Sequence, residues 1–189
     1  MRTQLLKRLC ILAALGLGLL TAPARAGQAN ATAAIVFKGT STLHDFEGTV
    51  ATRPFVATFH EDAATGQLRV TTKAALNVLD MNTDNKSRDK KMFKMLQQEK
   101  FAVIAGMLDD AIVPKEGSRE EKLRLSICGV EQEVTATLSD FGKSGDQIIC
   151  RMSFDVSLKA FGLKPPAVMG VIRVGDAVHI ECKIQGMVQ

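Results

Sequence analysis

The sequence contains no tryptophan and no tyrosine, and this absence narrows the kinds of ligand that it can bind. Sugar and purine sites commonly stack the ligand on those two rings, which also carry a polar group for hydrogen bonding. The large apolar side chains here are nine phenylalanines, eight methionines and the aliphatic residues. A cavity lined by such side chains is apolar and adaptable, so it suits a hydrocarbon better than a polar ligand.

Histidine is almost as scarce, and its three positions do not match a metal-binding motif. His44, His60 and His179 show neither an H-x-H nor an H-E-x-x-H spacing, and no Cys/His cluster accompanies them. A G-x-S-x-G nucleophile elbow is also missing. The sequence therefore predicts no catalytic residue, no metal site and no enzymatic activity.

Cysteine is present but in an arrangement that excludes CxxC redox chemistry. Beyond the N-terminal region the cysteines are Cys128, Cys150 and Cys182, and no two of them are close in sequence. An odd number in an exported chain allows at most one internal disulfide. Cys150 and Cys182 are in phase with the apolar positions of their expected strands. Both buried thiols and a Cys150–Cys182 bridge therefore stay open as alternatives.

No apolar run is long enough to span a bilayer, which needs ~20 residues. The longest run, residues 9–20, follows a positively charged stretch and precedes an A-x-A cleavage signal at residues 24–26. This pattern is typical of a secretory signal peptide. We expect residues 1–26 to be removed on export to the periplasm, which leaves a single domain over residues 27–189.

The excess of positive charge belongs to this leader. Four of the 24 Lys and Arg residues lie in it and none of the 20 Asp and Glu residues does, so the remaining chain is balanced. Nucleic-acid binding needs a basic stripe on the working domain. The sequence therefore predicts no nucleic-acid partner.

Period-two alternation of apolar and polar residues is the dominant pattern of the rest of the chain. Residues 147–158 place Ile148, Cys150 and Met152 on one face and Arg151 and Ser153 on the other. Such long antiparallel strands with one wet face require a sandwich or a closed barrel in one domain, and long strands favour the barrel. We expect about eight strands, some of the segments being continuous or very short: 34–41, 46–52, 54–60, 67–79, 101–113, 121–128, 132–140, 147–159, 168–174 and 177–186.

One segment breaks the alternation and predicts a single short helix at about residues 86–98. Met92, Met95 and Leu96 recur there at helical spacing, and Asp84 or Ser87 is placed to cap the start. The helix either packs its apolar face across one opening or side of the barrel, or is an ordinary surface helix with a solvated lysine face.

The segment "GTSTLHDFEGT", residues 39–49, holds the side chains of a catalytic triad within five positions. Ser41 would be the nucleophile, His44 the base and Asp45 the acid. In an extended strand His44 and Asp45 point to opposite faces, so they cannot form the required dyad. We interpret the segment as structural.

The apolar phase supports that interpretation, because it changes from odd to even positions across this segment. Such a change indicates a turn or a bulge between two strands. Thr42 and Asp45 can hydrogen-bond nearby backbone in such a turn. Phe46 would then anchor the next strand in the core, and His44 would cap the turn or point outward at a rim.

The chain resembles the YceI-like family, secreted bacterial proteins also described as polyisoprenoid-binding or lipocalin-like. The resemblance rests on the order and spacing of five segments: 37–48 (FKGTSTLHDFEG), 88–104 (RDKKMFKMLQQEKFAVI), 123–138 (LRLSICGVEQEVTATL), 154–168 (FDVSLKAFGLKPPAV) and 172–184 (IRVGDAVHIECKI). It implies an all-β fold, an antiparallel eight-stranded lipocalin-like barrel with one short helix inserted near residues 86–98. It also implies a long isoprenoid or similar amphiphile in the barrel and no enzymatic activity.

One segment departs from the family pattern. Where the family usually has F-P-x-I-x-F after the helix, residues 101–106 lack the proline and the second aromatic. Ala105 and Gly106 replace bulk at a wall of the expected cavity, so the shape and the identity of the ligand stay open, whereas the barrel does not.

We therefore expect a periplasmic binding or carrier protein for a long amphiphilic lipid of the polyisoprenoid or quinone type, with no other cofactor. The alternative is a non-enzymatic structural or interaction module of the envelope with a filled barrel core. A homodimer stays open. For each expected lining residue, core packing competes with ligand contact: Leu125, Ile127, Met152, Phe154, Val156, Leu158, Ile180, Met92, Met95 and Leu96.

A group of basic residues on the expected helix also allows two interpretations. Either it meets an anionic head group or a membrane surface, or it forms a solvated helix face. The group consists of Lys86, Arg88, Lys90, Lys91 and Lys94.

Overall fold

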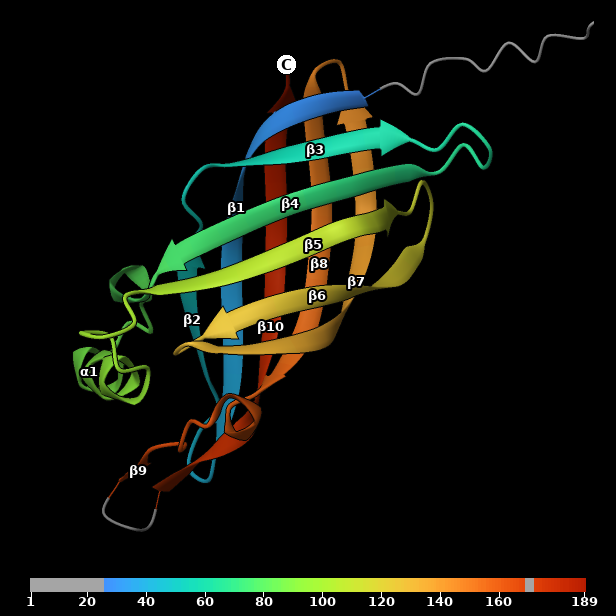
Figure 1. Cartoon of the computed structure of the whole chain (residues 1–189). Helices are drawn as coiled ribbons and strands as arrows, with labels where there is room; N and C mark the ends of the chain where they lie inside the picture. The colour runs from blue at the N-terminus through green and yellow to red at the C-terminus, as the bar shows by residue number, and fades with distance from the viewer. Residues whose placement is uncertain (1–25, 169–171) are drawn as a thin grey trace, which may run out of the picture.

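Antiparallel strands form one closed sheet in the computed structural model, which describes residues 26–168 and 172–189. Eight strands make the barrel, and the short strands β2 and β9 add to the edges of β1 and β10 (Figure 1). The strands are β1 (Ala26–Ser41), β2 (Phe46–Ala51), β3 (Phe55–Glu61), β4 (Leu68–Asn77), β5 (Val103–Val113), β6 (Ser118–Ile127), β7 (Val130–Ser144), β8 (Gln147–Ser157), β9 (Ala167–Val168) and β10 (Ile172–Val188). The expected eight-stranded barrel is confirmed.

The barrel closes because its first and last long strands pair with each other. β1 and β10 are in register from Ala29 opposite Val188 to Gly39 opposite Val178. Closure leaves no free edge along these strands. The start of β1 and the C terminus consequently lie at the same end of the barrel, near the β7–β8 hairpin (Figure 1). We call this the hairpin end.

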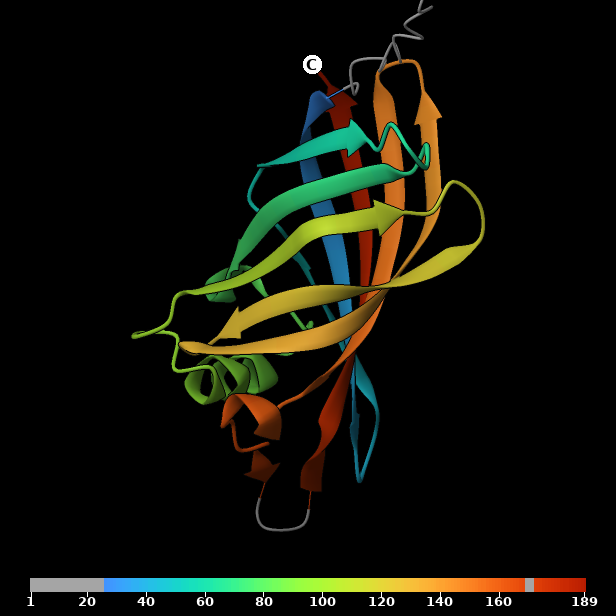
Figure 2. The same ribbon diagram turned by 45° about the vertical axis from the view of Figure 1, so that its right-hand side comes forward.

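Three short elements lie at the opposite end, which we call the α1 end. They are the helix α1 (Lys86–Met95), the β1–β2 turn and the 3-10 helix η2 (Lys159–Phe161) (Figures 1 and 2). A further 3-10 helix, η1 (Val78–Asp80), leads from β4 toward α1. None of the described helices has the length and apolar character needed to cross a membrane.

One edge of β1 changes partner halfway along, and this change shapes the α1 end. Residues 26–31 pair with β3, whereas residues 34–39 pair with β2. The Thr52 hydroxyl oxygen accepts a hydrogen bond from the Ala33 N–H at 2.9 Å where the partners change. On its outer edge, β2 forms an isolated β-bridge between Thr49 and Asn82, which lies next to α1. The barrel wall is thus completed by the α1 connection and not by a ninth long strand.

Phenylalanine rings cover a glycine on each strand of the β1–β2 pair. Phe37 lies opposite Gly48 and Phe46 lies opposite Gly39 in the β1–β2 pairing. Each ring occupies the space that a Cβ atom would take if the glycine were replaced. Cross-strand packing of this kind fixes register, because a slip by one residue would drive the ring against a bulkier neighbour.

The helix forms where the sequence predicts it but is shorter and differently capped. It ends at Met95, not at residue 98, and Gln97 follows with a φ of 48°. The cap is Asn85, whose side-chain oxygen accepts from the backbone N–H of Ser87 and Arg88 at 3.1 and 3.0 Å. Asp84 and Ser87 do not cap the helix, because Asp84 lies before it with a φ of 56° and Ser87 lies within its first turn.

The start of β1 also differs from the expectation. The strand begins at Ala26 and not at residue 34, because its inner positions Ala29, Ala31 and Ala33 are buried but too small to create apolar contrast in the sequence. Apart from Ala26, the expected signal peptide at residues 1–26 lies outside the described residues.

The segment after β1 is a turn, as its apolar phase predicts, but Ser41 and not Thr42 organises it locally. The Ser41 hydroxyl donates to the His44 carbonyl at 2.6 Å and accepts from the backbone N–H of Leu43 and His44. Thr42 instead bonds across to β10, where its hydroxyl oxygen accepts from the Arg173 N–H at 3.1 Å.

Replacing Gly48 with alanine should lower the free energy of unfolding by about 1–3 kcal/mol. A Cβ at this position would meet the Phe37 ring and would lie 2.7 Å from the Asn82 carbonyl oxygen, which is backbone and cannot turn away. Urea unfolding monitored by circular dichroism measures the change.

The matched control is Gly142→Ala. There the nearest atom is a carbon of the mobile Ile149 side chain at 3.1 Å, so the loss should be smaller. Equal losses for the two variants would contradict the role given to the Gly48 contact.

Candidate functional site: an apolar cavity inside the barrel

The barrel encloses a cavity of about 700 Å³ lined by side chains from every one of its eight strands and from α1. This volume lies in the range of ~300–1,000 Å³ typical of small-molecule sites. The lining follows β10 from Val174 to Val188, which corresponds to roughly 46 Å of extended strand. The cavity is therefore elongated along the barrel.

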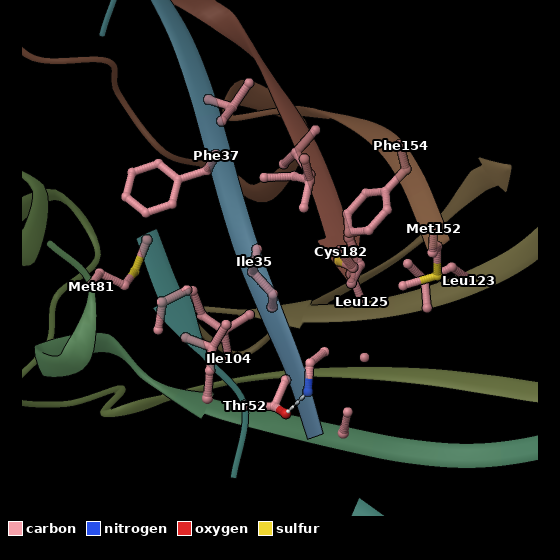
Figure 3. A pocket seen from close by; sticks show the side chains of 18 of the residues that line it. Ile35, Phe37, Thr52, Met81, Ile104, Leu123, Leu125, Met152, Phe154 and Cys182 are labelled. Atoms are coloured by element: carbon pink, nitrogen blue, oxygen red, sulfur yellow. Dashed lines mark hydrogen bonds between the residues drawn. The ribbon is translucent and has the colours of Figure 1, made fainter. Parts of the chain in front are cut away.

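The structure places all ten sequence-predicted lining residues on the cavity wall. Leu125, Met152 and Phe154 lie on one side of the cavity together with Cys182 (Figure 3). Contact with a ligand stays a prediction for each of the ten. The full set is Leu125, Ile127, Met152, Phe154, Val156, Leu158 and Ile180 from strands and from the residue that follows β8, with Met92, Met95 and Leu96 from α1 and its C-terminal cap.

Sequence reasoning missed the part of the lining that β1, β5 and the segment after η1 contribute. Ile35 and Phe37 of β1 face the cavity, as do Met81 after η1 and Ile104 of β5 (Figure 3). The alternation of Ile35 and Phe37 in the sequence is the signal that indicates an inner-face position for both. Further lining residues that the sequence reasoning did not name as such include Val50, Phe55, Phe59, Val70, Leu76, Leu108 and Leu123.

Small residues line part of the β4–β5 wall and leave room there. Ala74 lies opposite Gly106 in the strand pairing, and both line the cavity together with Ala105. A Cβ on Gly106 would lie 3.3 Å from a Leu125 methyl group, which shows that this position faces the interior. The departure from the family pattern at Ala105 and Gly106 thus falls on the cavity wall.

Polar groups in the middle of the cavity are already hydrogen-bonded to the chain. The Thr52 hydroxyl accepts from the Ala33 N–H, and the Thr72 hydroxyl donates to the Val56 carbonyl at 3.0 Å. No buried side-chain nitrogen or oxygen of the described residues lacks a partner. The middle of the cavity therefore presents an essentially apolar surface.

Most of the polar side chains of the lining gather at the two ends. At the α1 end, the lining residues that carry such groups are Ser41, His44, Asn85, Ser87, Arg88 and Lys91. Because Lys91 is exposed and also lines the cavity, the cavity reaches the surface here, and we call this opening the α1 mouth. At the hairpin end the charged lining residue is Lys143, which is exposed as well.

The Ser41, His44 and Asp45 side chains are not arranged as a triad. The Ser41 hydroxyl hydrogen bonds to the His44 carbonyl oxygen and not to its ring. Within residues 26–168 and 172–189, no three His, Cys, Asp or Glu side chains come together as metal ligands. Ser41 and His44 instead contribute to the α1 mouth.

All three described cysteines are free thiols, which answers the open alternative for Cys150 and Cys182. Cys150 lies opposite Ile184 and Cys182 lies opposite Met152, so the two sulfurs are not directly across from each other. Burial raises the pKa of Cys150 to about 11 and that of Cys182 to about 12. Both side chains line the cavity and are neutral near pH 7.

Alkylation of Cys150 by iodoacetamide should be slow at neutral pH and should still rise about tenfold per pH unit at about pH 10. The thiolate is the nucleophile, and a pKa raised to about 11 keeps its fraction small across this range. Peptide mapping by mass spectrometry measures the rate.

The urea-unfolded chain is the control, and there the rate should level off near the ordinary thiol pKa of 9.0. A folded-state rate that also levels off near that value would show that Cys150 is not buried in the cavity wall.

No protein-family model and no curated protein sequence matches this chain. Solved structures do resemble it. BcnA from Burkholderia cenocepacia is 14% identical, with a TM-score of 0.63 over 81% of this chain and 95% of that one. A polyisoprenoid-binding domain from Saccharophagus degradans, implicated in plant cell wall breakdown, is 11% identical, with a TM-score of 0.57 over 86% of this chain and 98% of that one.

A YceI protein from Campylobacter jejuni is 13% identical, with a TM-score of 0.53 over 71% of this chain and 81% of that one. At such identities the likeness is one of fold. The resemblance to the YceI-like proteins seen in the sequence is therefore confirmed at the level of the fold.

Proposed function

We propose that this chain, which has the fold of the YceI-like proteins, binds a long amphiphilic lipid of the polyisoprenoid or quinone type inside its barrel. The observation that carries the proposal is the elongated apolar cavity of about 700 Å³. A structural neighbour described as a polyisoprenoid-binding domain supports the same ligand class.

Physical chemistry favours a long apolar chain over a compact ligand. Each buried CH₂ group contributes ~0.8 kcal/mol before the costs of binding. The middle of the cavity offers no free hydrogen-bonding group that would reward a polar ligand, and its methionine and phenylalanine side chains adapt to a flexible chain. Affinity would thus increase with chain length until the cavity is filled.

Our proposal includes a carrier role in the periplasm and no enzymatic activity. The signal-peptide pattern of residues 1–26 supports export. The polar groups at the α1 mouth lack the base-and-nucleophile geometry of a catalytic site, because the Ser41 hydroxyl bonds to the His44 carbonyl oxygen and not to its ring. The basic residues of α1 would face an anionic head group or membrane surface, and a homodimer would be compatible with this function.

An alternative function is a structural or interaction module with a filled core. The cavity favours the lipid-binding function over this alternative, because an eight-stranded barrel can be filled by its own side chains and this one is not.

Native mass spectrometry of the protein isolated from its own periplasm should show one lipid per chain, with a mass that organic extraction recovers. The measurement reports the oligomeric state at the same time. A ligand-free protein that also fails to take up a labelled long-chain prenyl alcohol would refute the lipid-binding function and favour the interaction module.

Filling part of the cavity should weaken the binding of the prenyl alcohol. In Ala74→Phe the new ring would occupy the space between Ala74 and Gly106, and overpacking of this kind should weaken prenyl-alcohol binding by about tenfold or more. Equilibrium binding of the labelled alcohol to the purified chain measures the effect.

Ala34→Phe is the matched control. Ala34 lies one strand position from the inner-face residue Ala33, but it is exposed on the outer face opposite Ala51. The control should bind the alcohol like the unmodified chain. Equal affinities for both variants would place the ligand outside the barrel.

A further inference from the structure

The basic residues of α1 divide into two faces of the helix. Arg88 and Lys91 are three positions apart and line the cavity, together with Met92 and Met95. Residues three or four apart lie on the same side of a helix. The remaining three, Lys86, Lys90 and Lys94, follow one another at intervals of four, are exposed, and do not line the cavity. Only the first pair is positioned to meet a ligand.

Arg88 is held in place at the α1 mouth. Its guanidinium carbon lies 5.1 Å from the centroid of the Phe46 ring. That ring is fixed in turn, because it packs over Gly39 on the neighbouring strand. A cation stacked on an anchored ring keeps its hydrogen-bond donors pointed outward in a fixed fork. Arg88 is therefore preorganised for a ligand and is not a freely moving surface side chain.

No carboxylate neutralises this pair. Neither Arg88 nor Lys91 forms an ion pair within the part of the chain that the structure describes. The acidic residue of α1, Asp89, is occupied elsewhere, since one of its carboxylate oxygens accepts from the Thr83 N–H at 3.0 Å and from its hydroxyl at 2.6 Å. The α1 mouth thus carries two positive charges that have no ion-pair partner among the described residues.

The hairpin end offers a weaker alternative. Lys143 is the charged lining residue there, and its neighbours on the wall are the apolar side chains of Phe141, Ile148 and Val188. A doubly charged anion would be attracted more strongly by the preorganised pair at the α1 mouth, because the Coulomb energy scales with the product of the charges.

We propose that Arg88 and Lys91 bind a phosphate-bearing head group at the α1 mouth, while the prenyl tail extends through the barrel toward the hairpin end. This inference rests on the proposed lipid-binding function and adds the chemistry and the orientation of the ligand. Arginine binds phosphate in a bidentate manner and lysine binds it as a point charge, so the two side chains suit this anion. His44 and Ser87 complete the rim around the head group.

Equilibrium binding of two labelled probes, a prenyl phosphate and a prenyl alcohol of the same chain length, tests the proposal on the full chain. The double variant R88Q/K91Q should bind the phosphate about tenfold to a hundredfold more weakly, because charge-assisted hydrogen bonds are lost. Its affinity for the alcohol should change by less than about threefold, since the apolar cavity is intact. Arg88→Lys keeps the charge but loses the bidentate fork and the stacking on Phe46, so its loss of affinity for the phosphate should lie between those of the unmodified chain and the double variant.

Two control variants locate the head group. K86Q/K90Q removes the same charge from the outer face of α1 and should leave the affinity for both probes nearly unchanged, as should Lys143→Gln. If K86Q/K90Q loses as much affinity for the prenyl phosphate as R88Q/K91Q does, the phosphate is attracted by the overall positive charge of α1 and not by a specific site. If Lys143→Gln loses more affinity for the prenyl phosphate than R88Q/K91Q does, the head group lies at the hairpin end and the proposed orientation of the lipid is wrong. Thermal unfolding of every variant confirms that the fold is retained.

The probes also separate this inference from the function on which it rests. If the unmodified chain binds neither probe, the lipid-binding function itself is refuted. If it binds both equally and R88Q/K91Q changes nothing, the barrel holds a lipid but the head-group site is wrong. Millimolar inorganic phosphate should not displace the prenyl phosphate, because it lacks the buried tail. Tight binding of inorganic phosphate alone would show that the site binds free phosphate and not the head group of a lipid.

Discussion

Pairing between β1 and β10 is the interaction on which the rest of this structure depends. It joins residues about as far apart as the chain allows, such as Ala29 and Val188, and it converts an open sheet into a closed barrel. Closure fixes the number of strands, and the number of strands fixes the width of the interior. Eight strands leave a space that either side chains or one ligand can fill. Here the small inner residues of β1 and of the β4–β5 wall leave part of that space empty.

β1 also creates the opening of the cavity at the α1 end. Because β1 exchanges β3 for β2 halfway along, the wall at the α1 end is not a continuous ladder of long strands. The β4–α1–β5 connection closes it with a helix, held by the Thr49–Asn82 bridge and by the Cys128 thiol, which donates to the Leu96 carbonyl at 3.0 Å. Side chains of a helix reach outward on all sides, so α1 can cover the cavity with Met92 and still present charged groups at its mouth.

The sequence predicts the fold well, because alternation is a local signal. The alternation of Ile148, Cys150 and Met152 with polar residues predicts the inner face of their strand without information about the neighbouring strands. The loss of this alternation predicts the helix. The start of β1 was missed where alanine and glycine occupy the inner face. Whether the interior is empty could not be predicted, because this depends on the summed volume of residues from eight strands and on their register. For the same reason, the role of Ser41 and His44 at the α1 mouth follows only from the position of α1, which begins more than forty residues further along the chain, at Lys86.

The distribution of polar groups fits the proposed amphiphile better than it fits a plain hydrocarbon. Thr52 and Thr72 lie within the cavity, but their hydroxyls are committed to backbone partners, so a hydrocarbon tail can pass them without leaving a polar group unsatisfied. Burial of an unpaired charge would be costly anywhere along this path. Arg88 and Lys91 avoid that cost because they lie where the cavity meets solvent. A molecule with one long apolar part and one charged end matches this arrangement at both positions, whereas a pure hydrocarbon would leave the charged mouth unused.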